Sequence, residues 1–76
     1  MKKSEMERII EEEGVRWFEE MREFVKTLPE RTNSLEETIT RRIVPMIRKY
    51  RELEKKYPRF TRLLDYLGNL LTHLDE

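Results

Sequence analysis

Apolar residues recur along the chain at steps of three and four, in three stretches. This spacing places them on one face of an α-helix. The three sets are Met6, Ile10, Trp17, Met21, Phe24 and Leu28; Leu35, Ile39, Ile43, Met46, Tyr50, Leu53 and Tyr57; and Phe60, Leu63, Leu64, Leu67, Leu70, Leu71 and Leu74. No stretch alternates with period two for long enough to predict a strand. The pattern therefore predicts an all-α protein.

Serine and proline residues set the expected bounds of these helices. Ser4 and Ser34 each precede a glutamate by three residues, which is the spacing of a capping box at a helix start. Pro29 prevents the first helix from continuing, and Pro58 suits the first turn of the third. We expect helices over about residues 4–28, 34–56 and 58–74, in one domain that spans residues 1–76.

The expected packing is an up-down-up antiparallel three-helix bundle, because the first two helices are joined by a short linker. Pro45 lies inside the second helix, where it removes a backbone donor and crowds the carbonyl of Arg41. We expect a kink at Pro45, with a break into two short helices as the alternative. Gly14 and Gly68 lie inside the first and third helices, and each costs about 1 kcal/mol relative to alanine.

The small size of the chain favours self-association. A single core in a chain of this length seldom supplies more than about 3–5 kcal/mol, and there is no cysteine to add a disulfide. Ile9, Phe18 and Val25 lie outside the apolar arc of the first helix, so we expect them to form a protein interface in a homodimer. The alternative is that Phe18 and Val25 cover the third helix.

Charge is balanced overall, with 16 basic and 16 acidic residues, but it is unevenly distributed. Residues 38–62 hold nine basic and two acidic side chains, between two acidic segments. On the second helix, two rows of basic residues repeat every seven positions: Arg41, Arg48 and Lys55, and Arg42, Lys49 and Lys56. Such a face could bind a phosphate backbone. The interpretation that we favour is a solvated face beside an acidic helix, because Asn, Gln and Ser are missing from both rows.

Nothing in the sequence favours catalysis. The chain has no cysteine and one histidine, His73, without a nucleophile at helical spacing, and no glycine-rich phosphate loop. We expect no enzymatic activity, no cofactor, no metal and no small-molecule substrate. No apolar run is long enough to span a membrane, and no signal segment follows the first residues. The expectation is a soluble, cytoplasmic protein.

Alanine and glutamine are both absent. A hyperthermophilic origin explains the missing glutamine and cysteine, and a designed sequence also explains the missing alanine, because design fills exposed helix positions with Glu, Lys and Arg. Both origins stay open, and thermostability is expected. The sequence therefore predicts a non-enzymatic helical module for protein–protein interaction or self-assembly, or a designed bundle without natural activity. The alternative is a small nucleic-acid-binding protein that uses the second helix.

Overall fold

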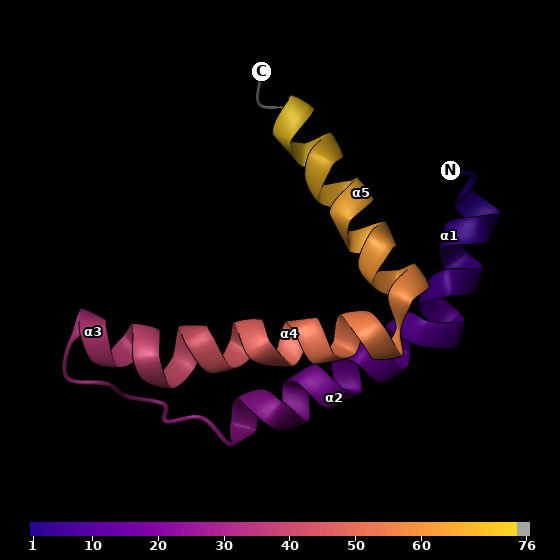
Figure 1. Ribbon diagram of the computed structural model, residues 1–76. Helices are drawn as coiled ribbons and strands as arrows, with labels where there is room; N and C mark the ends of the chain where they lie inside the picture. Colours follow the sequence, from indigo (N-terminus) through magenta and orange to yellow (C-terminus); the bar gives the residue numbers. More distant parts are fainter. Residues whose placement is uncertain (75–76) are drawn as a thin grey trace.

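A computed structural model of the chain describes residues 1–74, and these form three helices (Figure 1). The first consists of α1 (Lys3–Ile9), the π-helical turn η1 (Ile10–Gly14) and α2 (Val15–Lys26). The second consists of α3 (Leu35–Thr38), the π-helical turn η2 (Ile39–Ile43) and α4 (Val44–Lys56). The third is α5 (Pro58–Leu74). For the described residues, the predicted all-α fold with three helices is confirmed.

The two predicted capping serines behave differently. The Ser34 hydroxyl oxygen accepts a hydrogen bond from the backbone N–H of Glu37 at 3.1 Å, and the Glu37 carboxylate accepts one from the N–H of Asn33 at 2.7 Å. This reciprocal pair stabilises the start of α3. The prediction for Ser4 is wrong: the first helix begins at Lys3, so Ser4 lies inside it and makes no capping hydrogen bond.

The second helix continues through Pro45 without a break. Just before the proline, the backbone N–H of Val44 donates to the carbonyl of Ile39, five residues back. A π-helical turn of this kind changes the hydrogen-bond register of the helix. Here it lies directly before the residue that has no N–H to donate, and the helix resumes beyond it. The expected kink at Pro45 stays a prediction.

The first helix packs against two different partners along its length. Its first half, α1 and η1, lies against α5, and its second half, α2, lies against α4 (Figure 1). Tyr57 is the one residue between α4 and α5, and at this corner α5 leaves α4 at a steep angle (Figure 1). Every residue from Asp65 to Leu74 is exposed. The third helix therefore packs over its first half only, and the predicted bundle is formed in part.

The core lies where the three helices meet. Its buried apolar residues are Ile9, Trp17, Leu53, Tyr57, Phe60 and Leu63. The radius of gyration is 14.8 Å, against about 11 Å for a compact chain of this length. The accessible surface is 6381 Å², against about 5,000 Å² for a compact monomer of this mass. The chain thus exposes about a quarter more surface than its size requires. None of the described helices is long and apolar enough to cross a bilayer.

Candidate interaction surfaces

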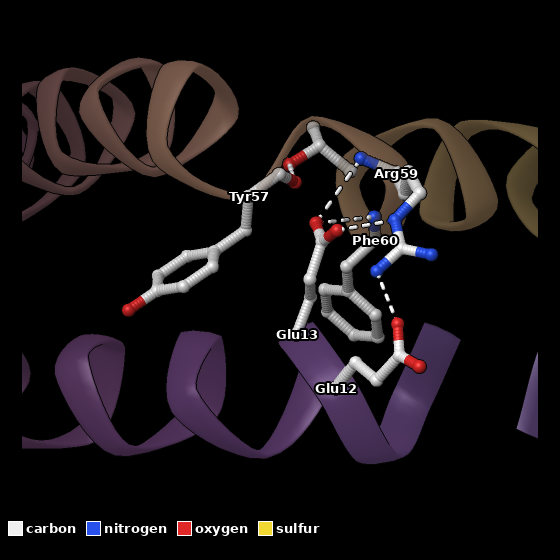
Figure 2. Close-up of polar contacts among 6 residues, drawn as sticks. Glu12, Glu13, Tyr57, Arg59 and Phe60 are labelled. Atoms are coloured by element: carbon white, nitrogen blue, oxygen red, sulfur yellow. Dashed lines mark hydrogen bonds and ion pairs between the residues drawn. The ribbon is translucent and has the colours of Figure 1, made fainter. Parts of the chain in front are cut away.

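A polar cluster fixes the corner at which α5 begins. One oxygen of the Glu13 carboxylate accepts hydrogen bonds from the backbone N–H groups of Arg59, at 3.2 Å, and Phe60, at 3.3 Å (Figure 2). The other accepts from Nε of Arg59 at 2.6 Å, and the same guanidinium donates to Glu12. Glu13 therefore caps the N-terminus of α5 from a neighbouring helix, where free N–H groups and the helix dipole favour a carboxylate.

Two carboxylates at this corner have lowered pKa values. Burial on its own would raise the pKa of Glu13, but the hydrogen bonds from Arg59 and the α5 backbone, with the guanidinium charge, bring it below its usual value. The pKa of Glu20 is lowered by hydrogen bonds from the Tyr57 hydroxyl and from Nζ of Lys56, at 2.9 Å. Both groups stay charged at neutral pH and hold the first helix against the α4–α5 corner.

A close approach between Gly14 and Phe60 fixes the same corner from the apolar side. A Cβ atom on Gly14 would lie 2.7 Å from Cε1 of the Phe60 ring, so no larger residue fits without movement. The ring is held on its other sides by Trp17 and Phe18, whose ring centroids lie 5.5 and 5.8 Å away. Packed rings and a capping carboxylate thus set the direction in which α5 leaves the core.

The exposed half of α5 presents a row of leucines, which we call the leucine row: Leu67, Leu70, Leu71 and Leu74. It continues the helix face that is buried at Phe60 and Leu63, yet the last two leucines are 64% and 80% exposed. The segment from Tyr66 to Leu74 has no Asp, Glu, Lys or Arg, in a chain of which 42% is charged. A helix face with this composition is suited to burial against another surface.

A second apolar surface lies between α2 and the second helix. We call it the apolar groove, and it is lined by Trp17, Met21, Ile43, Met46, Ile47 and Tyr50. Its volume is about 390 Å³. Of its lining residues, Ile43 and Ile47 are about half exposed, and Trp17 also belongs to the core. Within residues 1–74, the buried indole N–H of Trp17 has no acceptor. The groove is therefore an open apolar surface next to the core.

The predicted interface residues of the first helix lie in three different environments. Ile9 is 6% exposed and belongs to the core, so it is not available to a partner, because α1 packs against α5 on that side. Phe18 is 58% exposed, and its ring also contacts Phe60 of α5, as in the alternative interpretation. Val25 is half-buried near the end of α2. The structure does not bring these three side chains together in one surface.

The leucine row and the apolar groove were not predicted as surfaces, because the periodicity places most of their residues in the interior of a bundle. Two features of the sequence indicate these exposed surfaces. One is the charge-free segment that ends at Leu74, and the other is the single residue, Tyr57, between two helical stretches. Antiparallel helices need a connection of about two to five residues.

The basic residues of the second helix divide into two groups. Arg42 donates to the carbonyl of Pro29, and the other two members of its row pair with carboxylates of α2 or α4. In the other row, Arg41 lies 3.5 Å from Glu37, and neither Arg48 nor Lys55 forms an ion pair with any described residue. The first group thus helps to join the helices, and the second remains on the surface.

Among residues 1–74, no three histidine or acidic side chains converge as metal ligands. No protein-family model, curated protein or solved structure matches this chain. The candidate surfaces therefore stand on the geometry described above.

Proposed function

We propose that this protein is a non-enzymatic helical module that acts by protein–protein interaction, and that it associates with itself as a homodimer. The observation that supports this function is the leucine row, an apolar and charge-free half-helix that extends from the core into solvent. Apolar surface of this kind is favourable to bury, and a partner can cover it without separating charges from water.

The exposed area also favours association. The chain has about 1,300 Å² more accessible surface than a compact monomer of its mass. A stable protein–protein interface removes about 800 Å² from each partner. The excess is therefore sufficient for a dimer interface of ordinary size. The core, with six buried apolar residues among residues 1–74, is small for an independent domain.

Light scattering on a size-exclusion column tests this function. We expect the chain, 9.5 kDa as a monomer, to run at twice this mass at high concentration and to dissociate on dilution. The row variant, Leu71→Glu/Leu74→Glu, should be monomeric. Its control is Asn69→Glu/Thr72→Glu, which adds the same charge to the opposite face of the same half-helix and should leave the dimer intact. A wild-type chain that is monomeric at every concentration contradicts self-association.

A second candidate function is nucleic-acid binding through the second helix. It is favoured by Arg48 and Lys55, which lie on the surface without ion pairs to described residues, and by Arg51 beside them. Binding should weaken as salt rises, and each lost phosphate contact should reduce the slope of log K against log salt by about 1. We expect Arg48→Gln/Lys55→Gln to reduce this slope by about 2. A wild-type chain that binds neither DNA nor RNA at low salt excludes this candidate.

The composition further leads us to expect a thermostable protein. A thermal melt followed by circular dichroism should show a midpoint well above the range of about 45–65 °C in which mesophilic domains unfold. A midpoint inside this range contradicts the expectation, whichever origin the sequence has.

A further inference from the structure

The direction of α5 prevents the leucine row from covering the chain's own apolar groove. Tyr57 is the whole connection between α4 and α5, whereas a helix that folds back along its neighbour needs about two to five connecting residues. Glu13 holds the start of α5 by three hydrogen bonds, and Gly14 lets Phe60 pack directly on the first helix. The corner is therefore fixed, and α5, which carries the row, extends away from α4 (Figure 1).

The leucine row and the apolar groove match in length and chemistry. The row extends from Leu67 to Leu74, and the side of the groove formed by η2 and α4 extends from Ile43 to Tyr50. Each covers two helical turns, or about 10 Å at 1.5 Å per residue. The row offers four branched aliphatic side chains, and the groove offers aliphatic, thioether and aromatic side chains without a charged group. A helix laid between α2 and α4 would complete the three-helix packing that the corner prevents within one chain.

We propose that the leucine row of one copy fills the apolar groove of a second copy, and that the leucine row of the second copy fills the groove of the first. This inference rests on the self-association proposed above. The row and the groove are different surfaces, so a one-way contact would extend into an open chain of molecules. A reciprocal exchange closes a two-fold symmetric dimer with two identical contacts. Together, these two contacts would bury part of the excess accessible surface of both chains.

The first arm of the test compares the two halves of the contact. The groove variant is Ile43→Glu/Ile47→Glu, and it should be monomeric like the row variant Leu71→Glu/Leu74→Glu. Each variant should raise the dimer dissociation constant at least 100-fold. The matched control for the groove is Arg48→Gln/Lys55→Gln, which changes the net charge equally on another side of the same helix and should leave the constant within about threefold. Circular dichroism at 222 nm checks that every variant is still helical.

The second arm identifies which surfaces meet. The chain has no cysteine, so single cysteines can be placed without background. A copy with Leu71→Cys, mixed with a copy with Ile47→Cys, should be joined by a short bismaleimide into a mixed dimer. Neither copy should cross-link with itself in comparable yield. Asn69→Cys, on the opposite face of α5, should give no mixed product with Ile47→Cys.

The outcomes separate this inference from the function on which it rests. A monomeric wild-type chain overturns both. A dimer that survives in the groove variant, or that cross-links from Leu71→Cys to Leu71→Cys, shows that the rows pair with each other; self-association then stands and the exchange is wrong. A dimer that survives in the row variant, or that cross-links from Ile47→Cys to Ile47→Cys, overturns the exchange in favour of pairing between grooves. A dimer without the mixed product also overturns it.

Discussion

Replacement of Gly14 by alanine should destabilise the protein, although alanine is the better helix former. The new Cβ would lie 2.7 Å from Cε1 and 2.9 Å from Cδ1 of Phe60, whereas carbon atoms in favourable contact are about 3.5–4.0 Å apart. Phe60 is 3% exposed and its ring is held by two other aromatic rings, so it has little room to move away. Overpacking of this kind costs about 1–3 kcal/mol.

The chain contains its own control for this substitution. A Cβ on Gly68 would meet no atom within 4 Å, so Gly68→Ala should increase the free energy of unfolding by up to about 1 kcal/mol through helix propensity alone. Gly14→Ala should gain the same free energy from helix propensity, but the clash with Phe60 should subtract the overpacking cost from it. The difference between the two variants therefore isolates the contact with Phe60, and we expect it to be about 1–3 kcal/mol.

Denaturation in urea, followed by circular dichroism, measures both variants. All samples need the same protein concentration, because the stability of an associating chain depends on it. Phe60→Leu provides a further check: on this background the cost of Gly14→Ala should fall, since the clashing ring is gone. The reasoning is refuted if Gly14→Ala is as stable as Gly68→Ala, or if Phe60→Leu leaves its cost unchanged.

Other predictions follow from the helix ends and the corner. Ser34→Ala should cost about 1 kcal/mol of unfolding free energy, whereas Ser4→Ala should cost nothing measurable; equal effects in denaturation would contradict the assigned caps. Glu13 and Glu20 have pKa values below the usual 4.5, so their contribution is complete above about pH 4.5 and is lost as the pH falls through the lowered values. The thermal midpoint should therefore fall as the pH drops below about 4.5. Glu13→Gln should destabilise the chain at pH 7 and show a smaller fall; an equal fall would argue against the role of this carboxylate.

Hydrophobic periodicity was sufficient to predict the three helices, because it depends on local geometry that each stretch carries by itself. Ser34 was correctly assigned from its spacing to Glu37, since a capping box is formed within one turn. Ser4 has the same spacing but lies inside the helix, where its hydroxyl caps nothing. A capping motif therefore indicates a helix start only where the chain before it leaves the helical conformation.

The direction of α5 could not be predicted from periodicity, because it depends on contacts between residues far apart in the sequence. Glu13 follows two other glutamates in the sequence, yet it caps a helix that begins 45 residues later. Gly14 looked like a weak point in a helix, yet it is the place where Phe60 packs. Both residues act through partners that the first-helix sequence does not reveal, and together they decide which leucines are buried and which remain exposed.

The same corner links the stability of this protein to its association. Leu71 and Leu74 are mostly exposed, and Leu67 and Leu70 are about two-fifths exposed. Together they leave the surface of about two leucine residues in water. Burying that much should contribute about 3–6 kcal/mol for each row covered. The cost of ordering two molecules in one complex offsets part of this gain. A partner on the leucine row should still stabilise the folded chain, so the free energy of unfolding should rise with protein concentration.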